Sequence, residues 1–384
     1  MQKSVGSFLA VSRPASSTKL DSLEIGRFVA ASMVLFSHLP WFVQLFARSP
    51  QDTVFGGWVP PGPFAVQYFF TLSGFVMIMV HHRDFGTHGA PVGFWWRRAC
   101  RIYPMYWLAL LATLLCLKGP PKMVDLSKFI TLAPVMVQNV VPPAWSLHVE
   151  MAFYVIFGFC LLPWIGRPLL GLWILTVLAL CWRPDLQTWL HVPQLLETNA
   201  ALYIFGTNYV FYHVQFFSGL LAGWLYLKVP LGRKVAAALL SAGVAALLAC
   251  LPFLQWGHLY FLPGLAPGLA FGFGALILGM ANLERSGGLQ LGKYARRLGA
   301  MSYPLYILHS AIMTVFIKLA GGPLEAAGFR LGNAGSYEFL LASAAAIYAI
   351  SAAIAFGVDQ PLQRLLRGIG YTPAHPARPR FDAA

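Results

Sequence analysis

The chain has 384 residues, of which 58% are hydrophobic and only 10% are charged, and its mean hydropathy is +0.64. An ordinary soluble domain carries about 25% charged residues, so this composition excludes a soluble globular protein and predicts a polytopic membrane protein. The formal net charge of +14 does not indicate nucleic-acid binding, because most of the lysines and arginines fall where membrane topology requires them.

Ten apolar segments predict an all-α fold with about ten transmembrane helices. The segments span residues 23–45, 63–80, 99–117, 145–162, 168–182, 207–227, 235–255, 262–281, 300–319 and 338–357. The segment at 168–182 is short for a span. No small-residue cleavage pattern follows the first segment, so we expect it to remain as the first helix and not to be removed as a signal.

Both termini are expected in the cytoplasm. With this orientation, 20 of the 27 lysines and arginines lie on the cytoplasmic side, in agreement with the positive-inside rule. The sequence thus predicts a polar cytoplasmic segment at 1–19, a transmembrane domain at 20–360 and a basic cytoplasmic tail at 361–384. The tail is rich in proline and arginine, and we expect it to be disordered.

The first apolar segment carries Arg27 and, eleven positions later, His38. This spacing places both on one helix face, about 16 Å apart along the axis. Arg27 would lie at the membrane edge and His38 deep in the apolar zone, where an ionisable group normally faces a bundle interior or a wet cavity. His38 is either a functional group or a hydrogen-bonding link to a neighbouring helix, and depth alone does not separate the two.

The second segment contains Ser73 and Gly74, whose small size predicts close helix packing. The third is entered through Arg97, Arg98 and Arg101, followed by Tyr103. Arg97 and Arg101 lie one turn apart with Arg98 beside them, so their guanidinium groups could grip the phosphates of an anion arriving from the cytoplasm. The alternative is an anchor at the membrane edge with an aromatic belt.

Histidines and cysteines near these segments do not indicate a metal site or a disulfide framework. His81, His82, Asp84 and His88 fit no tight metal-ligand spacing, so no metal is expected. The cysteines are odd in number, lack a C-x-x-C pair and lie in or beside apolar segments, where they would pack as small hydrophobic residues. They are Cys100, Cys116, Cys160, Cys181 and Cys250.

The fourth segment begins with Trp145 and Ser146 and carries Glu150. Ser146 and Glu150 share a helix face, and an acidic residue running into an apolar span needs a partner such as a histidine or a bound hydroxyl. His148 points elsewhere on this helix and is expected at the membrane interface. In the ninth segment, Tyr303 and His309 are intramembrane polar residues, and His309 either lines a cavity or bonds across helices.

Taken together, the motifs resemble the membrane acyltransferase-3 family, bacterial O-acyltransferases that modify surface glycans. The motifs are Arg-x10-His, Phe-Phe-x-Leu-Ser-Gly-Phe, Phe-x-x-Arg-Arg-x-x-Arg-Ile-x-Pro, Trp-Ser-Leu-x-x-Glu and Ser-Tyr-x-Leu-Tyr-x-Leu-His, in this order over residues 20 to about 310. One departure is Glu24, which stands where the family often has an arginine. Some members carry a further carboxyl-terminal domain, and this chain looks like the stand-alone form.

The resemblance implies transfer of an acyl group, most simply acetyl from acetyl-CoA, to a sugar hydroxyl of an exported glycan at the bacterial inner membrane. His38 would be the general base or, in a variant, carry the acyl group itself, and Glu150 would orient His38 or hold the acceptor. The acyl-CoA donor would bind through Arg27, Arg97, Arg98 and Arg101. The residues expected to line the substrate cavity are Ser73, Tyr103, Trp145, Ser146, Tyr303 and His309.

A carrier or flippase for lipid-linked sugars is the alternative from another functional class. Buried histidines and arginines in a polytopic membrane fold fit it too. The sequence shows no internal repeat and no inverted pair of interrupted helices, which favours the acyltransferase. Partners expected in either case are the lipid bilayer and a glycan or glycolipid, and the sequence indicates no oligomeric state.

Overall fold

The computed structural model describes residues 20–47, 60–116, 127, 129–132, 140–182, 210–253, 265–326 and 335–369. These residues are organised in helices, with no strand among them, which confirms the predicted all-α class. The amino-terminal segment 1–19 and tail residues 370–384 lie outside the described residues.

Each of the ten predicted segments is a helix. They are α1 (Asp21–Ala47), α2 (Gly62–His81), α3 (Ala90–Cys116), α5 (Trp145–Cys160), α6 (Gly166–Trp182), α9 (Val210–Lys228), α10 (Arg233–Cys250), α11 (Ala266–Arg285), α12 (Gly292–Ala326) and α13 (Gly335–Ile354). Short turns η2 (Pro142–Ala144) and η4 (Leu251–Phe253) adjoin α5 and α10. Helix α3 begins well before its apolar segment, because the Trp-Trp-Arg-Arg run is already helical.

The start of the tail is folded, which corrects the expectation of disorder there. A π-helical turn, η6 (Ala355–Asp359), continues α13 into α14 (Gln360–Ile369). Asp359 is buried and accepts hydrogen bonds from the side-chain amide of Gln363 at 2.8 and 2.9 Å. Helix α14 is strongly amphipathic, with one apolar and one polar face. Its apolar face can stabilise it although its composition is basic.

Seven helices in the described part of the chain are long and apolar enough to cross a membrane. These spans are Gly62–His81, Ala90–Cys116, Val210–Lys228, Arg233–Phe253, Ala266–Arg285, Gly292–Phe316 and Leu340–Leu366. Helices α5 and α6 have only 16 and 17 residues, whereas a full span takes about 20. The protein is therefore a multi-helix membrane protein, and the count of ten spans stays a prediction.

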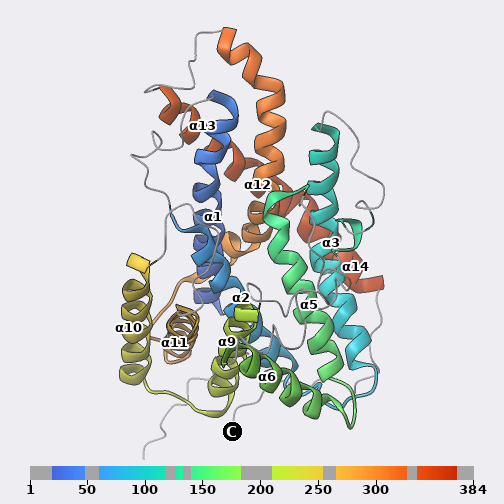
Figure 1. Ribbon diagram of the computed structural model, residues 1–384, viewed down its shortest axis with the longest axis vertical. Coiled ribbons are helices and arrows are strands. Elements are labelled where there is room, and N and C mark those ends of the chain that lie inside the picture. Colours follow the sequence, from blue (N-terminus) through green and yellow to red (C-terminus); the bar gives the residue numbers. More distant parts are fainter. Residues whose placement is uncertain are drawn as a thin grey trace, which may run out of the picture.

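Helix α1 is central to the packing, because it contacts α2, α11, α12 and α13. Helices α9, α10 and α11 pack together as one group at the lower left of Figure 1, and α3 and α5 stand on the opposite side. Helix α12 contacts both α1 and α3. Segments far apart in sequence thus surround the polar faces of α1, α2 and α3.

Small residues let α2 and α9 approach closely, as predicted for Gly74. A Cβ atom on Gly74 would overlap the backbone oxygen of Phe216, and one on Gly219 would overlap the backbone oxygen of Thr71. Backbone atoms on the facing helix cannot rotate away as a side chain can. Both glycines are therefore required by the helix spacing.

We expect Gly219→Ala to lower the apparent melting temperature of the purified protein. The added methyl group overlaps the backbone of α2, and overpacking of this kind costs about 1–3 kcal/mol. Gly171→Ala on α6 is the matched control: its Cβ meets nothing within 4 Å, and alanine favours a helix over glycine by about 1 kcal/mol. Equal melting temperatures for the two variants would contradict the close packing of α2 and α9.

The amino end of α1 meets the carboxyl end of α11. The backbone amides of Asp21 and Ser22 donate to the carboxylate of Glu284 at 2.7 and 2.8 Å, so this carboxylate caps α1 from another helix. Arg285 donates to the backbone oxygens of Tyr226 and Val229, at the end of α9. Three segment ends that the charge pattern assigns to the cytoplasm therefore lie together.

Reporter fusions test this assignment. Fusions at Lys228 and Lys293 should report the cytoplasm, because positive residues concentrate in those turns. A fusion after Lys122, which lies outside the described residues, should report the opposite side. Opposite signals at two of the three positions would overturn the topology and the side from which the donor enters.

Candidate active site

A cavity opens between α1, α2, α3, α5 and α12. Three arginines from two helices line it, Arg27 of α1 and Arg98 and Arg101 of α3. Its hydroxyl and carboxyl groups come from Ser73, Ser146, Glu150, Tyr154, Ser302, Tyr303 and Tyr306. The remaining wall is mostly apolar, so the polar groups are concentrated in a small space.

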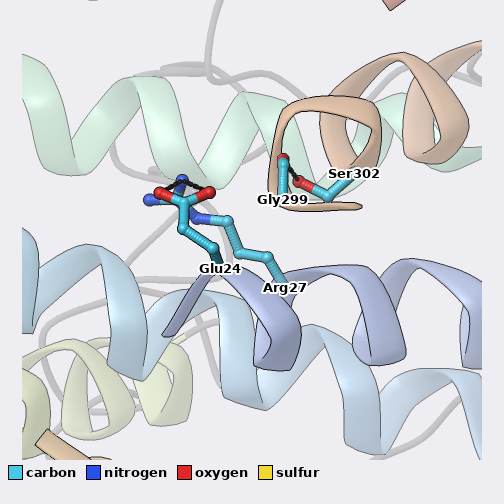
Figure 2. A network of polar contacts seen from close by, with 4 residues as sticks. All are labelled: Glu24, Arg27, Gly299 and Ser302. Carbon is cyan, nitrogen blue, oxygen red and sulfur yellow. Dashed lines mark hydrogen bonds and ion pairs between the residues drawn. The ribbon is translucent and has the colours of Figure 1, made fainter. Parts of the chain in front are cut away.

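Glu24 and Arg27 form an ion pair one turn apart on α1, with 3.3 Å between Nη1 of Arg27 and Oε1 of Glu24. Figure 2 shows the two side chains meeting each other beside the turn of α12 that holds Gly299 and Ser302. A Cβ atom on Gly299 would overlap the carboxylate of Glu24. Glycine is therefore needed there for α12 to accommodate Glu24, the residue that departs from the family pattern.

The structure separates the arginines that the sequence grouped together. Arg98 lines the cavity, and its guanidinium lies over the rings of Tyr154 and Phe94 at 5.2 and 5.5 Å. Arg97 instead points toward Asp84, with 4.0 Å between Nη2 and Oδ2, and it does not line the cavity. The expectation that Arg97 belongs to the same group is thus corrected.

Asp84 also binds His81, whose Nδ1 lies 2.6 Å from Oδ2 of the carboxylate. Two of the four residues considered above as metal ligands, His81 and Asp84, thus form a local hydrogen bond with each other. Within the described ranges, no group of three or more His, Cys, Asp or Glu residues could hold a metal ion.

Glu150 of α5 faces the cavity, where it accepts hydrogen bonds from the hydroxyl groups of Tyr154 and Ser73. The Ser73 contact is long, at 3.5 Å. No hydrogen bond joins Glu150 to His38 in the part of the chain that the structure describes. Glu150 therefore has no direct hydrogen bond through which it could orient His38.

A small hydroxyl network forms part of the cavity wall. The hydroxyl groups of Ser146 and Tyr306 lie 2.6 Å apart, and both contact the backbone oxygen of Pro143, at 3.2 and 3.1 Å. Phe69 packs edge-on against the ring of Tyr306. This arrangement ties the start of α5 to α12.

His38 and His309 meet across α1 and α12, with 2.8 Å between Nδ1 of His38 and Nε2 of His309. Their rings are nearly parallel, with an interplanar angle of 15°. His309 is fully buried, whereas His38 is half-buried. Neither lines the cavity, but His309 lies one turn beyond Tyr306, which does.

The predicted cavity-lining residues divide into two groups. Ser73, Ser146 and Tyr303 line the cavity, and Tyr303 donates to the backbone oxygen of Ile102 at 2.7 Å. Tyr103 does not, because its hydroxyl donates to the backbone oxygen of Thr131 instead. Trp145 packs on the ring of Tyr212, away from the cavity.

Two tyrosines of the cavity, Tyr154 and Tyr306, were missed by sequence reasoning. Their spacing could have indicated them, since Tyr154 lies four residues after Glu150 and Tyr306 three after Tyr303. His148, expected at the membrane interface, is buried inside the protein.

A helical membrane fold around a cavity lined by arginines and a carboxylate, with two histidines nearby, is the architecture of a membrane enzyme. A family model described as an acyltransferase domain matches residues 20–358, and the chain belongs to the acyltransferase-3 family. The protein is thus an acyltransferase of the membrane.

A curated relative is similar to most of the chain. It is the exopolysaccharide production protein ExoZ of Rhizobium meliloti (strain 1021), 28% identical over 284 residues, which cover 67% of this chain and 78% of the relative. No solved structure matches the chain.

Proposed function

We propose that this acyltransferase works in the bacterial inner membrane and moves an acetyl group from acetyl-CoA to a sugar hydroxyl of an exported or cell-surface glycan. The observation that carries the proposal is the cavity in which Arg27, Arg98 and Arg101 meet Glu150. Similarity to an exopolysaccharide production protein supports a polysaccharide acceptor.

The donor phosphates would bind at Arg98 and Arg101. Arg27 is already paired with Glu24, whereas neither Arg98 nor Arg101 forms an ion pair within the described residues. Two guanidinium groups at one wall suit the several oxygen atoms of a phosphate, which they can bind in a bidentate manner. The pantetheine arm would follow the face of α1 from Arg27 toward His38, a rise of about 16 Å.

His38 would be the general base. An imidazole titrates near neutral pH and can take the proton of a sugar hydroxyl as that oxygen attacks the thioester. Its half-buried position on the same face of α1 as Arg27 fits a group that meets the acyl end of the donor. Glu150, with its partners Tyr154 and Ser73, would hold the acceptor in the cavity.

A thiol-release assay tests the proposal. Purified protein in lipid nanodiscs should release free CoA thiol from acetyl-CoA when a polysaccharide acceptor is present, and the acceptor should gain the mass of acetyl groups. Comparison of surface polysaccharide from cells with and without the protein identifies the acceptor. Polysaccharide export that depends on the protein, without thiol release or added acetyl mass, would show a carrier or flippase instead.

A further inference from the structure

The hydrogen bonds of the His38–His309 pair indicate which ring nitrogens carry protons. Each ring has two nitrogens, and the hydrogen bonds of one nitrogen determine which of them carries the proton. His309 Nδ1 lies 2.8 Å from the backbone oxygen of Tyr306 and 3.2 Å from that of Leu305. Its Nε2 faces His38 at 2.8 Å.

The order of donors follows from these contacts. Backbone oxygens only accept hydrogen bonds, so Nδ1 of His309 carries a proton and donates it. No carboxylate hydrogen-bonds either ring within the described chain, and an unpaired charge is costly at this depth, so both rings are neutral. In a neutral imidazole the other nitrogen accepts, so Nε2 of His309 accepts from Nδ1–H of His38.

We propose that His309 is a positioning residue that holds His38 in the Nδ1–H tautomer, so that Nε2 of His38 is left as the proton acceptor. The inference rests on the proposed role of His38 in acyl transfer. His309 is fully buried and acts only through His38, which is half-buried. The helical turn from Tyr306 to His309 anchors His309 itself, so α12 sets the orientation of both rings.

The proton and bond changes balance with this tautomer. The acceptor hydroxyl gives its proton to Nε2 of His38 while its oxygen bonds to the thioester carbonyl carbon. The resulting tetrahedral adduct collapses, the carbon–sulfur bond breaks, and the departing sulfur takes the proton from Nε2. His38 returns to its neutral form, and Nδ1–H remains bonded to His309 throughout.

Nitrogen NMR tests the tautomer without any assay of activity. Protein labelled with ¹⁵N at its ten histidines would be measured in nanodiscs, and His38→Gln would identify the signals of His38 by their loss. We expect Nδ1 of His38 to be protonated and Nε2 to be unprotonated. The reverse tautomer, or a cationic ring, would overturn the inference even if acyl transfer is found.

Two substitutions then test the effect on the reaction. His309→Phe keeps a flat ring but removes the hydrogen-bond acceptor for Nδ1–H of His38. We expect kcat to fall at least about tenfold, because the variant loses part of the rate enhancement of about 10² to 10⁴ that a general base contributes. His309→Gln can donate to the Tyr306 carbonyl and present an oxygen to His38, so it should retain more kcat than His309→Phe. In both variants, KM for acetyl-CoA should stay near that of the parent.

The outcomes separate the inference from the proposed function. Equal kcat for folded His309→Phe and the parent would overturn the positioning role and leave acyl transfer intact. If His309→Phe does not fold, a change of the His38 tautomer in folded His309→Gln with unchanged kcat would overturn it as well. A parent without acyl transfer would refute the proposed function, while the NMR result would still decide the tautomer.

Discussion

His38→Gln should insert and accumulate normally but lose acyl transfer by at least about a hundredfold. Removal of a general base typically costs about 10² to 10⁴ in rate, and glutamine can form a hydrogen bond with His309 but cannot take up a proton at neutral pH. His38→Ala should be similarly inactive. The measurement is thiol release by the purified, correctly folded variants with the same acceptor as the parent.

Another intramembrane histidine provides the matched control. His213 of α9 is fully buried among aromatic rings, and its Nδ1 accepts from Nε1 of Trp173 at 2.9 Å. Since glutamine can still accept that hydrogen bond, His213→Gln should keep activity close to that of the parent. Near-normal turnover by His38→Gln would show that position 38 needs only a polar group, and the histidine would then serve to bridge α1 and α12.

Arg98→Ala should raise KM for acetyl-CoA by about 10- to 100-fold. This follows from the loss of hydrogen bonds to a charged group, worth about 1.5–3 kcal/mol. Arg101→Ala should act in the same direction, because both arginines line the cavity. Lysine at position 98 should rescue only in part, since it keeps the charge but not the bidentate geometry. Initial rates at varied acetyl-CoA concentration provide the measurement.

Arg97→Ala is the matched control for Arg98→Ala. Arg97 stands next to Arg98 in sequence but lies near Asp84, outside the cavity, so its replacement should leave KM close to that of the parent. If Arg97→Ala raised KM as much as Arg98→Ala, donor binding would extend beyond the cavity. If all three alanine variants kept normal donor kinetics, the arginines would serve only as a topology anchor.

The positions of the helices were predictable because they depend on local composition. Each apolar run became a helix, since a chain in a membrane must satisfy its backbone hydrogen bonds within the segment. The tight packing of Gly74 was predictable for a similar reason, because only a small residue lets another backbone approach closely. The folded start of the tail was missed, because its low apolar content concealed an amphipathic helix.

The choice among the arginines was not predictable. Residues three and four apart are both neighbours on a helix, so the spacing joins Arg101 equally well to Arg97 and to Arg98. Which of the two faces the cavity depends on where α5 and α12 pack against α3.

What the sequence by itself determined is the membrane class, the helices and the shared face of Arg27 and His38. Only the tertiary structure decided the partners on other helices: His309 lies 271 positions from His38, and Glu150 of α5 meets Ser73 of α2 instead of His38. The reason is physical. Helical periodicity determines which residues share a face of one helix, but contacts between helices depend on how the faces pack together, and that is a property of the whole bundle.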